Sequence, residues 1–377
     1  MAFCRHCGQQ LEDDANFCPS CGKACAEQAA SAAGAPETYD NLFDKLTGTV
    51  NKFAGGSGAV RPPLRKLFGT VFQKHTKEDG EEIFICGTAK TTPALTVEDT
   101  VWPQPWLFSR VFLAFAAAFL MLHICCSTFD NINTFPGLLV IGSFMVPLAT
   151  FVFFFELNSP KNISFFTAIK VFLVGGCASL LVTLMLFSIV PVYEMDYVGA
   201  VLVGIIEEFG KLAIVAYFIN SEKNVKYRVN GLLIGAAVGA GFAAFESAGY
   251  AFRMFLEVGY DAMIDNIFLR AVLAPGGHVV WAAIAGYGIM LVKGEEPLTL
   301  QTLKDKKFWR VFWMPVAMHA VWDMPINIGS EFALIQFLLV ALSWIIIFVL
   351  INNCLNEIAE ILKQEPEKQE TEEPVEA

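Results

Sequence analysis

The sequence predicts an all-α polytopic membrane protein with a small cysteine-rich domain at its N-terminus. Of its 377 residues, 55% are hydrophobic and 17% are charged, whereas a soluble domain carries about 25% charged residues. Most of the apolar excess lies after Trp102, in runs long enough to cross a bilayer, which takes about 20 helical residues. Two Cys-x-x-Cys-Gly motifs precede residue 26 and mark a separate, compact unit.

Eight apolar runs predict about eight transmembrane helices, which together form one membrane domain over residues 107–353. An acidic, proline-containing tail follows at 354–377, and its composition is typical of a disordered segment. Between the fifth and sixth runs, residues 256–270 are expected to form a solvated loop. The eight runs are 108–127, 136–156, 164–189, 197–219, 230–252, 271–292, 308–326 and 332–352.

Positively charged residues predict the orientation of these helices. Lys and Arg occur in the connections after the second, fourth and sixth runs, whereas the connections after the first, third and seventh runs contain neither. The connection after the fifth run has Arg253 and Arg270 at its edges. Because cytoplasmic loops carry the excess of Lys and Arg, we expect both termini in the cytosol, as an even number of spans requires. The predicted location is the cell membrane, with multiple passes.

The N-terminal cysteines are spaced as the ligands of a zinc ribbon. Four thiolates in two Cys-x-x-Cys knuckles suit tetrahedral Zn²⁺, whereas disulfides are rare in the cytosol. Residues 1–25 therefore predict a ribbon whose structural zinc is needed for folding. A cytosolic protein partner is expected for it; nucleic acid is not, since no basic patch is concentrated anywhere. The predicted ligands are Cys4, Cys7, Cys18 and Cys21.

The segment over residues 26–106 reads as a cytosolic linker with amphipathic stretches. Apolar residues recur at helical spacing in 42–53 and again in 64–72. Such helices either lie in the membrane interface or pack against the cytosolic face of the bundle, and the sequence leaves both open. Residues 82–86 resemble a short strand.

Six residues are nearly all of the ionisable residues deep inside the predicted spans, where a charge costs about 2.5–3.5 kcal/mol or more. At 1.5 Å per residue, the two adjacent glutamates lie about 15 Å from the outer ends of their spans, and the later glutamate and histidines lie about 10 Å from theirs. Four helices thus bring polar groups to similar depth, which favours one shared site. The residues are Glu207, Glu208, Lys211, Glu246, His278 and His319. The Gly-x-x-x-Gly repeat before Glu246 is typical of helix packing.

Two kinds of chemistry fit this set, and a structural alternative remains. Lys211 could simply form intrahelical ion pairs with Glu207 and Glu208, although one lysine does not neutralise three carboxylates. A buried carboxylate can act as a general base towards water while His and a cation stabilise an oxyanion. Alternatively, one Glu and two His could hold Zn²⁺ with an open position for water. Either arrangement suits amide hydrolysis within the membrane.

At these residues the chain resembles the PrsW-type intramembrane proteases, which are relatives of the type II CAAX prenyl endopeptidases. The resemblance covers about residues 190–330, with the motifs in the family's order. The prenyl endopeptidases are less similar, because they place an Arg one position after Lys211 and an Asn where Asp323 stands. The matching motifs are Glu207-Glu208-Phe-Gly-Lys211, Phe242-Ala-Ala-Phe-Glu246, His278 and His319-Ala-Val-Trp-Asp323.

The resemblance implies a protease that hydrolyses peptide bonds of membrane-embedded or membrane-proximal proteins, such as single-pass anti-sigma factors. Glu207 or Glu208 would activate water, and the site would need either a catalytic metal or the glutamates alone. The expected partners are membrane protein substrates and the lipid bilayer. The alternative is a non-catalytic membrane receptor or scaffold with a zinc-ribbon adaptor. A transporter is disfavoured, because the two halves show no inverted repeat.

Overall fold

The chain divides into an N-terminal unit, Met1–Asp40, and a membrane unit, Asn41–Ala377. The computed structural model describes residues 2–3, 10–11, 41–326 and 334–371. In the N-terminal unit, strands β1 (Ala2–Phe3) and β2 (Gln10–Leu11) pair in antiparallel fashion. The predicted zinc ligands lie outside the described residues; they are Cys4, Cys7, Cys18 and Cys21.

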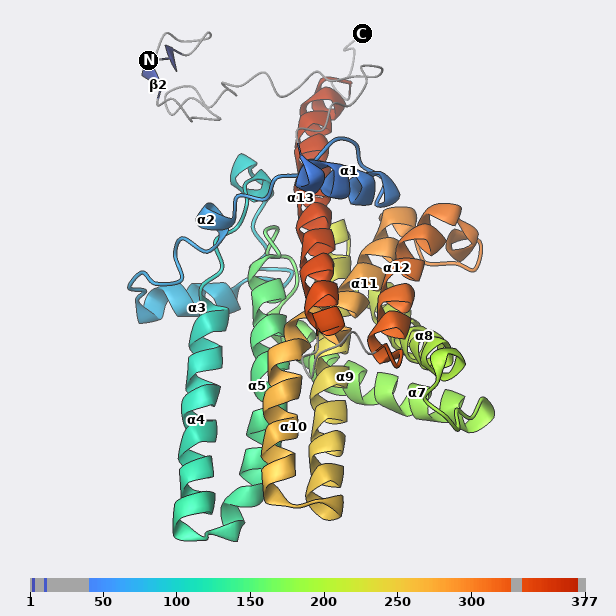
Figure 1. The fold of residues 1–377 in the computed structure, drawn as a ribbon. Helices are drawn as coiled ribbons and strands as arrows, with labels where there is room; N and C mark the ends of the chain where they lie inside the picture. Colours follow the sequence, from blue (N-terminus) through green and yellow to red (C-terminus); the bar gives the residue numbers. More distant parts are fainter. Residues whose placement is uncertain (1, 4–9, 12–40, 327–333, 372–377) are drawn as a thin grey trace, which may run out of the picture. The chain divides into compact units, whose positions relative to one another are not determined.

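The membrane unit is built from helices (Figure 1). Helices α4, α5, α10 and the second half of α9 run side by side, with the α4–α5 and α9–α10 turns at the same end. The longer helices are α4 (Leu107–Phe129), α5 (Phe135–Glu156), α7 (Gly176–Ile189), α8 (Tyr197–Ser221), α9 (Arg228–Glu257), α10 (Tyr260–Leu273), α11 (His278–Lys293), α12 (Lys306–Asp323) and α13 (Leu334–Thr371).

Short helical turns join or extend these elements. The helix α6 continues through a turn of π-helix, η3, into α7, so that the three form one apolar segment. The short elements are η1 (Val97–Thr100), η2 (Ile132–Thr134), α6 (Phe165–Lys170), η3 (Val171–Gly175), η4 (Ala274–Gly276) and η5 (Thr302–Lys304).

Within the described residues, six segments are long and apolar enough to cross a membrane, which confirms a multi-pass, all-helical membrane protein. The other two predicted runs form α8 and α12, which are helical but carry several charged residues each. The number eight therefore stays a prediction. The six segments are Leu107–Phe129, Ile132–Glu156, Phe165–Ile189, Arg228–Glu257, Tyr260–Lys293 and Leu334–Gln364.

The expected loop over residues 256–270 is wrong, because α10 occupies most of it. Met263, Ile264 and Ile267 are buried against the neighbouring helices. Their spacing is helical, so α10 presents an apolar face to the bundle. The apolar stretch then breaks at Pro275 in η4 and resumes as α11.

Helix α1 (Leu42–Phe53) packs on α13 and α12. Its Asp44, Thr47 and Asn51 are buried, and the Tyr287 hydroxyl of α11 donates to the Ala54 carbonyl at 3.2 Å. Of the two alternatives that the sequence left open, α1 thus adopts packing against the bundle. The second stretch yields only the single turn α2 (Leu64–Leu67).

The predicted strand at residues 82–86 is also wrong, because these residues belong to helix α3 (Lys77–Ile85) and its C-cap. A capping box fixes where α3 begins. The Thr76 hydroxyl accepts from the Asp79 backbone N–H at 3.1 Å, and the Asp79 carboxylate accepts from the Thr76 N–H at 2.7 Å. Two N–H groups that a helix leaves unpaired are thereby satisfied, and this local gain favours helix.

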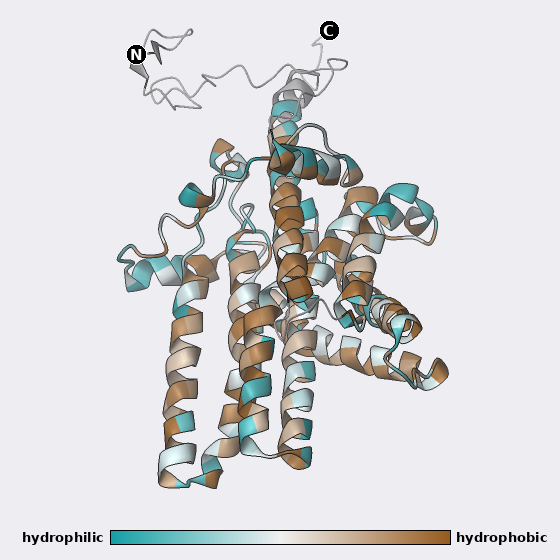
Figure 2. Cartoon of the chain, viewed as in Figure 1, coloured by the Kyte–Doolittle hydropathy of each residue, from teal (hydrophilic) through white to brown (hydrophobic). Residues whose placement is uncertain are grey.

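The sequence predicts a disordered tail from residue 354, but in the structure α13 continues to Thr371. Cys354, Leu355 and Ile358 are buried, and Glu357 accepts from the Arg228 backbone N–H at 2.8 Å. Packing and this contact extend the helix past the predicted boundary. Figure 2 shows α13 changing from apolar to hydrophilic along its length.

Helices α9 and α11 approach so closely that their backbones touch, as the Gly-x-x-x-Gly pattern predicts. A Cβ placed on Gly235 would lie 2.1 Å from the Ala282 carbonyl oxygen, and one on Gly239 would lie 2.2 Å from that of His278. Only glycine fits such contacts. The first residue of α11, His278, is thereby fixed against the middle of α9.

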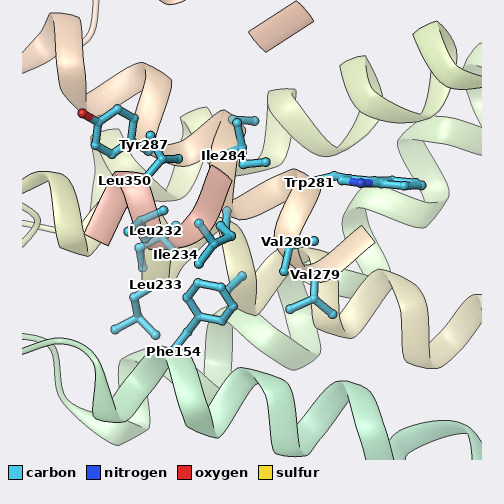
Figure 3. Close-up of a cluster of buried hydrophobic side chains, with 14 of the residues drawn as sticks. Phe154, Leu232, Leu233, Ile234, Val279, Val280, Trp281, Ile284, Tyr287 and Leu350 are labelled. Atoms are coloured by element: carbon cyan, nitrogen blue, oxygen red, sulfur yellow. The ribbon is translucent and has the colours of Figure 1, made fainter. Parts of the chain in front are cut away.

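The main hydrophobic core surrounds this helix pair. Phe154 of α5, Leu233 of α9, Val280 of α11 and Leu350 of α13 are all buried, and Figure 3 shows them gathered from four different helices. A scaffold of this kind holds α9 and α11 in fixed positions, and α8 and α12 then add the remaining polar residues.

Candidate active site

Helices α8 and α12 bring Glu208 and His319 together. Gly204 on α8 allows the approach, since a Cβ there would lie 2.9 Å from the Ala320 backbone nitrogen of α12. His319 Nδ1 lies 2.8 Å from Glu208 Oε1. Both side chains are almost fully buried, so the hydrogen bond forms away from water, where an unmade one would be costly.

Lys211 is the centre of the cluster and is fully buried. Its ammonium lies 2.7 Å from Glu208 Oε1 and 3.6 Å from Glu207 Oε2. It also donates to His278 Nδ1 at 2.8 Å and lies 4.4 Å from the ring centroid of Phe242. A buried lysine needs such partners, so the cluster is more than an intrahelical pair.

A second arm runs from α11 to α9 and α10. Because the Lys211 ammonium can only donate, His278 Nδ1 accepts, and Nε2 is left to donate to Glu246 Oε2 at 3.0 Å. The same oxygen accepts from Arg270 Nη2 at 2.6 Å, while Arg270 Nε donates to the Ser247 hydroxyl at 2.8 Å. Glu246 is thus held from two sides and orients the imidazole of His278.

The other face of His319 meets two more carboxylates. Its Nε2 lies 3.6 Å from Glu207 Oε2 and 3.4 Å from Asp323 Oδ2. Three carboxylates therefore surround this imidazole, counting Glu208 on Nδ1. Both ring nitrogens therefore face carboxylates, which orient the imidazole.

The structure places all six predicted site residues in this one cluster, drawn from α8, α9, α11 and α12. Sequence reasoning missed Arg270, which it assigned to the edge of a solvated loop, and gave Asp323 no role beyond its place in the motif. The signal for Arg270 was present: a single arginine lies within one apolar stretch, five residues before Pro275-Gly-Gly-His278.

The two adjacent glutamates differ in their surroundings. Glu208 is fully buried and its Oε1 is held by Lys211 and His319. Glu207 Oε2 is also buried but has no hydrogen-bond partner among the described residues, and Glu207 lines a cavity. Glu208 Oε2 is likewise buried without a hydrogen-bond partner among the described residues, and an unsatisfied buried carboxylate oxygen is expensive. Because Glu207 also lies beside the cavity, it is the better placed of the two to meet a water or substrate.

The donor set also fits a metal ion. Glu207, His278 and His319 each offer one ligand atom, and these atoms lie within 4.8 Å of one another. The orphaned Glu207 Oε2 faces His319 Nε2 and His278 Nδ1, at 3.6 and 3.9 Å. A His₂Glu set is one that catalytic zinc uses. For His278 to bind a metal ion through Nδ1, Lys211 would have to release its hydrogen bond to that nitrogen. Lys211 would keep its ion pair with Glu208.

Comparison with known proteins agrees with these motifs. Residues 163–351, about half of the chain, match the family described as PrsW family intramembrane metalloprotease, and residues 3–24 match a zinc-ribbon domain. The predicted zinc ribbon is thus confirmed as a domain, and the family description adds a metal-dependent protease without naming the metal. The matched segment contains every residue of the cluster.

Three similar proteins are each named Protease PrsW. The one from Clostridioides difficile is 28% identical over 177 residues, which cover 44% of this chain and 70% of the relative. The one from Halalkalibacterium halodurans is 28% identical over 39% of this chain and 63% of the relative. The one from Oceanobacillus iheyensis is 24% identical over 47% of this chain and 78% of the relative.

No solved structure matches the chain. The matches favour a peptidase over the receptor or scaffold that the sequence also allowed, and they confirm the resemblance to the PrsW family. The chain is a membrane peptidase that belongs to the PrsW family of intramembrane metalloproteases and carries a zinc-ribbon domain at its N-terminus.

Proposed function

We propose that this protease hydrolyses peptide bonds of membrane-embedded or membrane-proximal proteins, with water activated at its paired glutamates. Glu207 carries the proposal: its Oε2 is buried without a hydrogen-bond partner among the described residues, and the residue lines a cavity. A carboxylate so placed can take a proton from a water within hydrogen-bond reach.

The neighbouring groups supply the rest of the reaction. As the water oxygen bonds to the substrate carbonyl carbon, Glu207 accepts the proton that the water releases. Lys211 and His319 lie where positive charge can stabilise the carbonyl oxygen as it becomes negative. When the carbon–nitrogen bond breaks, the proton on Glu207 passes to the departing amine. Glu208 holds Lys211 and His319 in place.

A metal-dependent version uses the same residues. Glu207, His278 and His319 would hold the ion, which when bound would acidify its water and polarise the carbonyl. Glu208 retains a buried oxygen, Oε2, without a hydrogen-bond partner in the described part of the chain. In this version Glu208 is the carboxylate left to take up the proton.

The test is co-expression with candidate single-pass membrane proteins. Glu207→Gln and Glu208→Gln should each lower cleavage by about 10²-fold or more, which is the usual contribution of a general base. Both variants should remain inserted and monodisperse in detergent, because glutamine is nearly isosteric and Lys211 keeps His278 and one carboxylate as partners.

The matched control is Glu257→Gln, at the last residue of the neighbouring helix α9, where the side chain is exposed. It should cleave like wild type. Undiminished cleavage by both site variants would overturn the glutamate mechanism.

We propose further that Cys4, Cys7, Cys18 and Cys21 hold a structural zinc and that the ribbon binds a cytosolic protein. Both termini would lie in the cytosol of a plasma-membrane protein, as the Lys- and Arg-rich connections favour. The carboxylate cluster would then lie nearer the outer leaflet, and substrates would be cut near their extracytoplasmic membrane boundary.

A further inference from the structure

A cavity of about 270 Å³ lies beside Glu207, between α7, α8 and α9. We propose that it binds one apolar side chain of the substrate, next to the bond that is cut. The inference rests on the proposed function, because Glu207 at the cavity wall is the carboxylate assigned to the reaction. The cavity would thus be a subsite that determines specificity, and Gly249 would set the size of the cavity.

The chemistry of the wall favours an apolar side chain. One part carries the carboxylates of Glu207 and Glu246, where a peptide group would be attacked, and most of the rest is hydrocarbon. The lining residues are Leu180, Thr183, Leu184, Phe187, Glu207, Phe242, Phe245, Glu246, Gly249, Tyr250 and Arg253. A substrate backbone near Glu207 could place a leucine or phenylalanine side chain among these leucines and phenylalanines.

The cavity opens on the side of the bundle. Leu181, Leu184 and Met185 of α7 are more than half exposed, and Phe252 of α9 is nearly so. Exposed apolar side chains on both helices indicate that hydrocarbon, rather than water, surrounds the mouth. A membrane-embedded segment can therefore approach the mouth without leaving the bilayer.

The size excludes a whole transmembrane helix. A helix with side chains is about 10–12 Å across, whereas 270 Å³ corresponds to the volume of about nine waters. Pockets for drug-sized ligands are also larger, at about 300–1,000 Å³. The cavity therefore suits one side chain of a locally extended segment, and an extended segment is also what frees the carbonyl for attack.

Gly249 keeps the cavity open. Every other glycine of α9 has a neighbour that a Cβ would strike, at 1.9–2.4 Å, whereas a Cβ on Gly249 would meet nothing within 4 Å. Packing therefore does not require glycine at this position, and alanine would favour the helix. A longer side chain at residue 249 would extend into the space where we place the substrate.

The experiment uses the full chain and a library of single-pass reporters with a randomised extracytoplasmic juxtamembrane segment, whose products are sequenced. Wild type should prefer a large apolar residue at one position beside the cut. In Gly249→Phe and Gly249→Leu, the ratio of large to small residues at that position should fall by at least about tenfold, the range for apolar pockets. Gly249→Ala should give an intermediate ratio.

The control is Val272→Phe, at an exposed residue lining a separate cavity of about 770 Å³; its profile should match that of wild type. An unchanged profile in Gly249→Phe and Gly249→Leu, with cleavage retained, would overturn the subsite alone. The subsite would also be overturned if the Gly249 variants stayed monodisperse but lost all cleavage products equally. That result would indicate that the cavity binds lipid or has only a structural role. Absence of cleavage by wild type would overturn the proposed function and the subsite with it.

Discussion

Glu207 and Glu208 are neighbours in the sequence but have different surroundings in the fold. Successive residues of a helix point about 100° apart. Glu208 Oε1 therefore lies at 2.7 and 2.8 Å from Lys211 and His319, whereas Glu207 Oε2 lies 3.6 Å from each of them and Glu207 also lines the cavity. The sequence identifies both as site residues without distinguishing them, because the difference depends on which helix lies opposite each. That information is absent from α8 itself.

Arg270 shows a second limit of the sequence at this scale. Its partner Glu246 is 24 positions away on another helix, and no local pattern connects them. By contrast, the spacing of Lys211 from the paired glutamates is local, and its ion pairs are predictable from helical geometry alone.

We expect Arg270 to be a positioning residue that acts through Glu246 on His278. Arg270→Ala should lower kcat by about tenfold or more with little change in KM, because Glu246 loses one of its two partners while Arg270 itself is not among the residues that line the cavity. Arg270→Lys should restore part of the rate, since a lysine supplies the charge but not the fork that also reaches Ser247. Steady-state kinetics on one reporter measure both.

The double variant with Glu246→Gln provides the control. If Arg270 acts through Glu246, the combined loss should not exceed that of Glu246→Gln alone, because interacting residues are not additive. Fully additive losses would contradict the positioning role.

At the scale of elements, the glycines of α9 were the most predictable feature. Their four-residue spacing places them on one face of the helix, and that face contacts α11. The sequence does not name α11 as the partner, since several later helices also contain small residues. Close contact between these helices is what fixes the distance between Glu246 and His278.

We expect Gly235→Val to destabilise the protein by about 1–3 kcal/mol or more, which is typical of overpacking. A Cβ there would strike the Ala282 carbonyl, and a backbone group cannot move aside as a side chain can. Thermal unfolding in detergent measures the effect as a lower Tm.

Gly249→Ala on the same helix is the matched control, because its Cβ meets nothing and alanine is the better helix former. Its Tm should equal or exceed that of wild type. Equal melting of both variants would contradict the packing account.

The elements that the sequence mispredicted are those of weak or ambiguous periodicity. Helix α3 has nine residues, short enough for its apolar residues to fit a strand as well as a helix. Helix α10 lies beside Gly259 and Pro275, which read as loop signals. Its Met263 and Ile267 are buried by contacts with other helices, which the local sequence does not reveal.

At the scale of the whole molecule, the sequence predicts that polar groups from four helices share a depth, and the structure shows that they also meet laterally. Depth follows from counting residues along spans of known direction. Lateral contact requires the packing order of the helices, which the sequence of one chain does not give.

The zinc content of a ribbon variant can show which of the two units of the chain binds the metal. Cys18→Ser combined with Cys21→Ser should remove about one zinc ion per chain, because a ribbon needs its four ligands to hold the metal. Membrane insertion and cleavage should persist, since the ribbon and the membrane unit are separate. Metal analysis of the purified protein measures the stoichiometry.

About one zinc ion remaining in that variant would place a metal in the membrane site, and its removal by Glu207→Gln would identify the ligands. Equal zinc in wild type and the double-cysteine variant would contradict a zinc-binding ribbon.

The proposed orientation is tested by single cysteines at Glu194 and Ser221, both exposed and at opposite ends of α8, in a background without the native cysteines. An impermeant thiol reagent applied to intact cells should label residue 194 and should miss residue 221 until the cells are opened. The reverse pattern would invert the protein and move the predicted cut to the cytosolic side.

The glycine contact between η3–α7 and α9 has a mechanical consequence for the site. A Cβ on Gly176 would lie 2.4 Å from the Gly241 Cα, so the two helices are pinned there as at a pivot, whereas the cavity beside Gly249 lies further along both. Gly235 and Gly239 hold the backbone of α9 directly against that of α11, so we expect α7 to be the helix that moves when the cavity opens. A cross-link between the far ends of α7 and α9 should therefore abolish cleavage, whereas a cross-link between α9 and α11 should leave cleavage unchanged.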